Sequence, residues 1–186
     1  MKRFGRLIAL ALAGCSASGD SSASDNAAGP NTQSVGTDPI DYEETIHLDA
    51  EALAETGMAE AYEELQRQSG DLGVQWAPMR EMWDGQEEGY DGGENYRVEV
   101  NGKVYPVFGS APTDDPWAVA TATFFDVVNS QLADVPFKFY AISGGNDLSA
   151  VRLTPEEFER ATLYYRQPAD RPYLPNYIAP NYGFPQ

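Results

Sequence analysis

The sequence is poor in the residues from which most catalytic and metal sites are built. Its 186 residues include one cysteine, Cys15, and one histidine, His47. A single cysteine excludes an intrachain disulfide and a thiolate zinc site, and a single histidine excludes a cluster of histidine ligands. Ser143 precedes a Gly-Gly pair and lacks the Gly-x-Ser-x-Gly context of a hydrolase nucleophile. We therefore expect a protein that uses no cofactor and is not an enzyme.

Basic residues are also scarce. The chain has 12 Lys and Arg against 29 Asp and Glu, and its formal net charge is −17. A protein that binds the phosphate backbone needs clustered Lys and Arg, so this composition excludes a nucleic-acid partner. It also disfavours direct contact with anionic lipid headgroups. A cationic partner, a metal ion or solubility alone is compatible with the charge.

Long apolar runs are missing near the start of the chain, where a membrane anchor is often found. The apolar segment from Leu7 to Ala13 is far shorter than the roughly 20 residues that span a bilayer. It follows three basic residues and precedes small ones, which is the pattern of an export signal. Residues 1–14 are therefore predicted to be a signal peptide that is removed.

The end of this segment, Leu12-Ala13-Gly14-Cys15, resembles the lipobox of bacterial lipoproteins. The resemblance implies cleavage before Cys15, a thioether-linked diacylglycerol on its sulfur and acylation of its new amino group. Two or more acyl chains hold a protein stably on a membrane. In that family Ser16 is compatible with transfer to the outer membrane, so we expect a lipid-anchored protein of the cell envelope that faces the periplasm. The alternative is an ordinary secretory signal with an accidental cysteine.

Composition divides the mature chain into three parts. Residues 15–46, rich in Ser, Ala, Gly, Asp and Asn, have too few apolar side chains to fold and are predicted to be a disordered tether. Residues 47–165 have the size and patterning of one α+β domain. Residues 166–186 form an arm rich in Pro and Tyr, which disfavours a helix.

Three helices are predicted from apolar periodicity and capping residues. The first follows Asp49 and ends near Ser69, with Gly57 in its middle, so it forms either one helix or two. The second opens at Asp114-Asp115-Pro116, and the third opens at the capping box Thr154-Pro155-Glu156-Glu157. The broad apolar face of the second helix contains Trp117, Ala120, Thr121, Phe124, Val127, Val128 and Leu132.

Two hairpins are predicted between these helices. Asn101-Gly102 between alternating runs is a strong hairpin signal, which places Val100 opposite Lys103 and Tyr96 opposite Val107. A second hairpin pairs residues 135–142 with residues 148–153. Residues 78–83 are expected to form a helical turn. The resulting order, α-ββ-α-ββ-α, predicts a four-stranded antiparallel sheet covered on one face by helices.

An acidic loop is the one candidate metal site. Residues 84–94 place Asp84, Glu87 and Asp91 among glycines, and a calcium ion binds several oxygen ligands of this kind. Their spacing does not match an EF-hand. A solvated acidic turn before a strand is the alternative interpretation.

The C-terminal arm contains a tandem pattern, Pro175-Asn176-Tyr177-Ile178-Ala179 followed by Pro180-Asn181-Tyr182-Gly183-Phe184. Its aromatic side chains either pack back over their own domain or form a surface for a protein or glycan partner. The candidate binding residues are Tyr173, Tyr177, Tyr182 and Phe184.

These observations together favour a non-enzymatic, lipid-anchored, acidic binding protein of the cell envelope. Its membrane contact runs through the lipidated Cys15, and its partner is an envelope protein, for example a cationic one, or a glycan. Two alternatives remain open. One is an envelope hydrolase that uses a pair of carboxylates, and the other is a structural lipoprotein stabilised by calcium.

Overall fold

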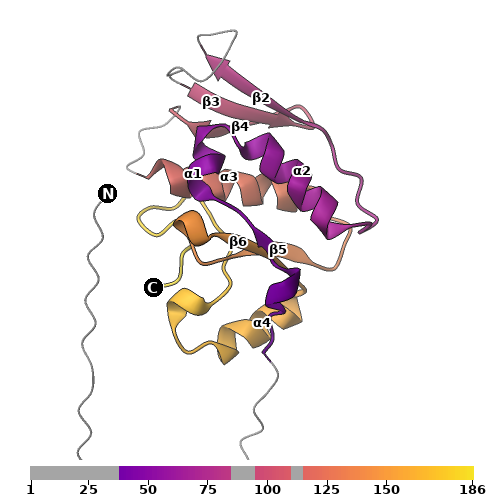
Figure 1. The fold of residues 1–186 in the computed structure, drawn as a ribbon, viewed down its shortest axis with the longest axis vertical. Coiled ribbons are helices and arrows are strands. Elements are labelled where there is room, and N and C mark those ends of the chain that lie inside the picture. Colours follow the sequence, from indigo (N-terminus) through magenta and orange to yellow (C-terminus); the bar gives the residue numbers. More distant parts are fainter. Residues whose placement is uncertain (1–37, 85–94, 110–114) are drawn as a thin grey trace, which may run out of the picture. The chain divides into compact units, whose positions relative to one another are not determined.

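The computed structural model describes residues 38–84, 95–109 and 115–186, which belong to a unit that begins at residue 36 (Figure 1). Its helices are α1 (Ala50–Glu55), α2 (Met58–Ser69), α3 (Pro116–Ser130) and α4 (Pro155–Tyr164). Its strands are β1 (Ile46–His47), β2 (Met79–Asp84), β3 (Asn95–Val100), β4 (Lys103–Phe108), β5 (Lys138–Ile142) and β6 (Ser149–Leu153). Three short 3₁₀ helices are η1 (Tyr42–Glu44), η2 (Gly145–Asp147) and η3 (Pro168–Asp170).

The strands form two three-stranded antiparallel sheets, ordered β2-β3-β4 and β1-β6-β5. The predicted mixture of helices and antiparallel strands is thus confirmed, but the single four-stranded sheet is not found. One reason is β2, which the sequence predicted to be a helical turn. Met79, Arg80 and Glu81 are good helix formers, and pairing along the whole length of β3 overrides that local preference.

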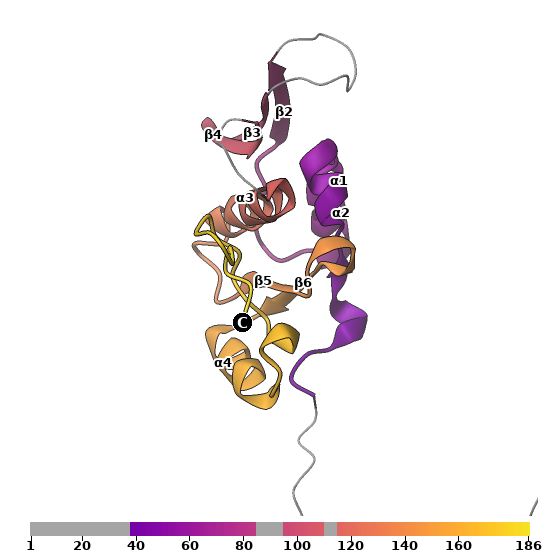
Figure 2. The same ribbon diagram turned by 90° about the vertical axis from the view of Figure 1, so that its left-hand side faces the viewer.

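Helix α3 separates the two sheets and prevents the two hairpins from pairing. Its residues contact β4 on one side and β5 on another, and both views show the helix layer between the sheets (Figures 1 and 2). A helix that is apolar around most of its circumference is typical of such a buried position. Its buried residues are Ala120, Thr121, Ala122, Thr123, Phe124, Phe125, Val127 and Val128. Trp117 departs from the prediction, because 40% of its surface is exposed.

The first predicted helix is two helices. The backbone N–H of Gly57 donates to the carbonyl of Ala52, which closes α1, and α2 begins at the next residue. A Cβ atom at residue 57 would lie 2.9 Å from the Ala52 carbonyl oxygen. The break therefore depends on glycine, because a side chain would not fit there. The sequence left open whether this segment is one helix or two, and the structure shows two.

The Asn101-Gly102 hairpin forms as predicted, with one correction. Val100 lies opposite Lys103, as expected, but Tyr96 lies opposite Phe108 instead of Val107. An irregularity between Tyr96 and Arg97 shifts the register there, as a β-bulge does. The predicted inner face is nevertheless buried: Tyr96, Val98, Val100, Tyr105 and Val107.

The sheet β1-β6-β5 is buried on both faces, between α3 and α4. The predicted capping box is present, with Thr154 accepting from the Glu157 backbone N–H and Glu157 accepting from the Thr154 backbone N–H. On the α4 side a second apolar cluster forms from Ile40, Tyr140, Ile142, Val151, Leu153 and Ala161.

Both ends of the described chain pack against this sheet. Ile40 is 2% exposed and β1 pairs with β6, so the folded unit includes residues that the sequence assigned to the tether. In the arm, Tyr173 exchanges two backbone hydrogen bonds with Ala141 of β5, at 2.8 and 2.9 Å. The structure thus supports the alternative in which the arm packs against its own domain.

Candidate functional site

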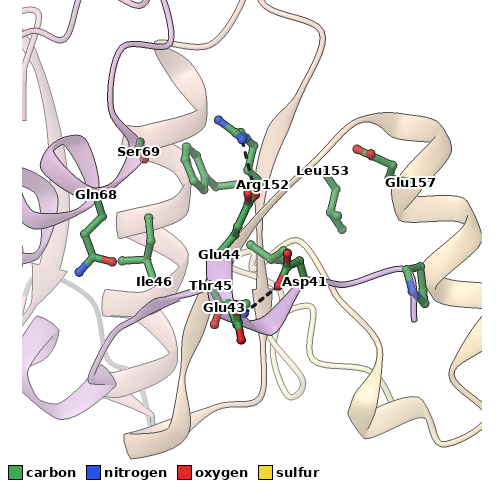
Figure 3. Close-up of a pocket in the computed structure, with 13 residues that line it drawn as sticks. Asp41, Glu43, Glu44, Thr45, Ile46, Gln68, Ser69, Arg152, Leu153 and Glu157 are labelled. Carbon is green, nitrogen blue, oxygen red and sulfur yellow. Dashed lines mark hydrogen bonds and ion pairs between the residues drawn. The ribbon is translucent and has the colours of Figure 1, made fainter. Parts of the chain in front are cut away.

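One pocket among the described residues is lined mainly by acidic and polar side chains. It has a volume of about 420 Å³ and lies between η1, the end of α2, strand β6 and the start of α4 (Figure 3). We call it the acidic pocket. Its lining residues are Pro39, Asp41, Glu43, Glu44, Thr45, Ile46, Gln68, Ser69, Phe139, Val151, Arg152, Leu153 and Glu157.

Four carboxylates and one guanidinium line the acidic pocket. Arg152 Nη2 lies 3.8 Å from Glu44 Oε2, and both side chains are at least 40% exposed, so this ion pair is a weak one. Asp41 accepts from the backbone N–H of Glu43 at the start of η1, and the two residues lie close together in Figure 3. Arg152 offsets one of the four negative charges, so the pocket keeps a net negative charge.

Glu157 belongs to the acidic pocket and to the cap of α4. The Thr154 backbone N–H donates to Oε2 of Glu157 at 2.8 Å, and the Thr154 hydroxyl donates to it at 2.9 Å. The backbone hydrogen bond is the main reason why the pKa of the Glu157 carboxyl lies below its ordinary value. The carboxylate therefore stays ionised at mildly acidic pH.

The end of α2 lies at the same pocket. Gln68 and Ser69 belong to the last turn of α2, where helix carbonyls carry a partial negative charge. The Ser69 hydroxyl oxygen is buried and has no hydrogen-bond partner among the described residues. Several carboxylates around one opening are suited to an ammonium or guanidinium group.

A second pocket, of about 280 Å³, lies beneath the C-terminal arm. We call it the aromatic pocket. The first turns of α3, the loop at Gly144 and Gly145, and the arm build its walls. Its lining residues are Ala50, Asp115, Trp117, Ala118, Thr121, Gly144, Gly145, Tyr173, Pro175, Pro180, Asn181, Tyr182, Phe184 and Gln186.

Tyr173 and Phe184 form the inner wall of the aromatic pocket. Tyr173 is 7% exposed, and its hydroxyl donates to the carbonyl of Ser143 at 2.9 Å. Burial raises the pKa of the Tyr173 phenol to about 12, since the charged form would lose its hydration. The rings of Tyr173 and Phe184 meet edge to face, with centroids 5.2 Å apart and an angle of 73° between their planes.

The structure brings together three of the four predicted binding residues. Tyr173, Tyr182 and Phe184 line the aromatic pocket, whereas Tyr177 lines a separate pocket beside Phe125 and Leu174. The Tyr177 hydroxyl lies 3.2 Å from the Thr123 hydroxyl. Trp117 was assigned by its spacing to the core, so its place at the aromatic pocket could not be read from the sequence.

The other candidates are placed as follows. Asp84 ends β2 and forms an ion pair with Arg97, while Glu87, Asp91 and Cys15 lie outside the described residues. His47 is exposed on β1, and Ser143 precedes η2 with a φ of 59°, in a turn as predicted. Within residues 38–84, 95–109 and 115–186, no three His, Cys, Asp or Glu side chains are placed to hold a metal ion.

Sequence reasoning missed the acidic pocket because its residues come from four distant segments. Asp41, Glu43 and Glu44 lie in the segment that was predicted to be a tether. In the sequence, Arg152 is simply a polar residue on the outer face of a predicted strand. Acidic residues are so common in the chain that these three do not stand out. No sequence pattern connects them with Glu157.

Comparisons with protein-family models, curated proteins and solved structures found no match to this chain. Over the described residues, no helix has both the length and the apolar character needed to cross a bilayer.

Proposed function

We propose that this protein is a lipid-anchored, acidic binding protein of the cell envelope, and that its acidic pocket holds a basic group of a cationic partner. The observation that carries this proposal is the lining of the acidic pocket, which contains four carboxylates and one arginine. The protein acts by binding and not by catalysis. Its anchor is the diacylglycerol expected on Cys15, at the outer membrane facing the periplasm.

Electrostatics support a cationic partner in two ways. The formal net charge of −17 attracts basic proteins over a distance and speeds their encounter. At close range, the exposed carboxylates of Glu43 and Glu44 can each pair with a lysine or arginine side chain. The carbonyl end of α2 adds to the same negative potential.

The position of the acidic pocket in the chain fits a tethered protein. Its first lining residues, Pro39 to Ile46, belong to the last part of the stretch that was expected to be tether, which leaves residues 15–38 as the tether. A flexible chain of about 24 residues spans roughly 25–30 Å, which would separate the pocket from the headgroups.

A binding experiment tests the acidic pocket. We expect a fluorescently labelled oligolysine peptide to bind the full-length protein at low salt. The double variant Glu43→Gln, Glu44→Gln should weaken this binding about tenfold, equivalent to about 1.4 kcal/mol. Fluorescence anisotropy at several salt concentrations measures the affinity.

A matched control separates the pocket from general acidity. Glu55→Gln with Glu159→Gln removes the same charge from two exposed positions outside the acidic pocket, and we expect it to change the affinity less than threefold. Equal losses in the two double variants would contradict a pocket-specific interaction.

For the anchor, mass spectrometry of the native protein should find acyl chains on Cys15, and Cys15→Ser should release the protein from membranes. A bare thiol would reject the anchoring.

A further inference from the structure

The aromatic pocket has an exposed aromatic wall. Trp117 lies in the first turn of α3 with 40% of its surface exposed, whereas the buried residues of the helix begin at Ala120. A large side chain of this kind at the edge of a cavity is available to stack on a ligand. Phe184 and the buried Tyr173 also line the pocket.

The polar groups of this pocket are mainly neutral. Thr121 and Asn181 offer a hydroxyl and an amide, which can donate and accept. The one charged side chain in the lining is Asp115, whose carboxylate caps α3 by accepting from the Ala118 backbone N–H at 2.9 Å. The positive end of the helix dipole offsets that charge, so the pocket favours an uncharged ligand.

The arrangement of the rings disfavours a planar ligand. A nucleobase or similar ring is best held between two parallel aromatic faces, whereas Tyr173 and Phe184 stand at 73° to each other. A single exposed ring instead suits a ligand with one apolar face and polar groups around its rim. A pyranose ring has this form, because its C–H groups cluster on one face and its hydroxyls point outward.

The volume of the pocket limits the ligand to about one such ring. At about 280 Å³, it falls just below the about 300–1,000 Å³ of pockets that take drug-sized molecules. Hydrogen bonds connect the parts of the frame around it, since the Tyr173 hydroxyl donates to the Ser143 carbonyl and the Asn176 backbone N–H donates to the Tyr182 carbonyl, each at 2.9 Å. Such constraint holds the arm and the 143–147 loop in one arrangement before a ligand arrives.

We propose that the aromatic pocket is a second binding site, which takes one pyranose ring of a neutral glycan stacked on Trp117 with its hydroxyls near Thr121 and Asn181. This site is separate from the acidic pocket and does not depend on a cationic partner. In an envelope protein it would bind a glycan while the acidic pocket binds a basic group.

Calorimetric titration of the full-length protein with two neutral probes, cellotriose and tri-N-acetylglucosamine, tests the proposal. We expect saturable binding of at least one of them. Trp117→Ala should weaken it at least tenfold, and Asn181→Ala, which removes an exposed amide, about threefold. The control is Trp83→Ala, because Trp83 is 41% exposed but lies on β2, outside the pocket. It should leave the affinity unchanged.

Three results would overturn the proposal: no saturable binding of either trisaccharide, an unchanged affinity in Trp117→Ala, or adenosine competing for the site with higher affinity. If Trp117→Ala does not fold, the proposal is overturned by an unchanged affinity in Asn181→Ala, or by a loss in Trp83→Ala as large as that in Asn181→Ala. The double variant of Glu43 and Glu44 should bind the sugar normally, so this site and the acidic pocket fail or succeed independently.

Discussion

Single polar side chains connect elements that are far apart in the sequence. Glu81 on β2 accepts a hydrogen bond from the backbone N–H of Ala59 in the first turn of α2, at 3.0 Å. The residue at the N-cap of this helix, Gly57, has no side chain that could do so. Asn129 of α3 pairs its amide with both the N–H and the carbonyl of Phe139 at the start of β5, each at 2.9 Å. These contacts satisfy backbone groups that would otherwise lack a partner.

The first prediction concerns Glu81, which also accepts from the Tyr96 hydroxyl. Glu81→Ala should lower the free energy of unfolding by about 1–3 kcal/mol, because it leaves the start of α2 uncapped and the Tyr96 phenol without its carboxylate acceptor. Glu81→Gln keeps one oxygen acceptor and should cost less. Urea denaturation measures both, and Tyr96→Phe isolates the phenol contact. Equal stability of the alanine variant and the wild type would contradict the capping role.

At the scale of elements, the C-terminal arm completes a sheet. Tyr173 pairs with Ala141 and so covers part of the β5 edge, which would otherwise expose unpaired backbone groups. The arm then turns back on itself, and the Asn176 backbone N–H donates to the Tyr182 carbonyl. Gly183 allows this turn. Its φ is +88°, and a Cβ atom there would lie 2.3 Å from the Leu174 carbonyl oxygen.

The second prediction follows from that close approach. Gly183→Ala should displace the end of the arm, increase its cleavage by proteases and open the aromatic pocket. Gly70→Ala is a matched control, because Gly70 also has a positive φ, +66°, but no atom lies within 4 Å of the added Cβ. The control should cost about 1–3 kcal/mol for backbone conformation alone, because φ of 66° with ψ of −157° is a conformation almost restricted to glycine. Limited proteolysis with mass spectrometry compares the two, and equal protection of the arm would contradict its tight docking.

At the scale of the whole molecule, tyrosines are buried at several separate places in the fold. Burial is the largest cause that raises the pKa of Tyr62, Tyr96, Tyr140, Tyr165 and Tyr173. Hydrogen bonds to carboxylates raise it further in two of them, since Tyr96 donates to Glu81 and Tyr165 to Asp38. Folding therefore favours the protonated phenol at each of these sites.

The third prediction is a loss of stability at alkaline pH. An unfolded tyrosine ionises near pH 10, whereas Tyr173 in the folded protein has a pKa of about 12. The contribution of such groups is fully present below about pH 10 and is lost as the pH rises through the folded pKa. Spectrophotometric titration of tyrosinate should show a class that ionises near pH 10 and a delayed class that ionises with unfolding. A single class in the native protein, identical to that in denaturant, would contradict the burial.

Features that depend on a few neighbouring residues could be predicted. Asn101-Gly102 specifies a tight turn through backbone conformation, and the Thr154 capping box specifies the start of α4 through contacts within one helical turn. The apolar periodicity of α3 predicted a buried helix for the same reason. By contrast, β2 could not be predicted, because its residues favour a helix until β3 lies beside them.

The sequence by itself determined the acidity of the chain, the local starts and ends of helices and turns, and the inner face of the first hairpin. Only the tertiary structure decided that α3 separates two sheets and that the arm packs on β5. It also decided that Trp117 lines the aromatic pocket and that the acids of η1 line the acidic pocket. The physical reason is range. Capping, turn chemistry and periodicity act between residues a few positions apart, whereas pairing and burial depend on contacts between segments whose order in space no local pattern specifies.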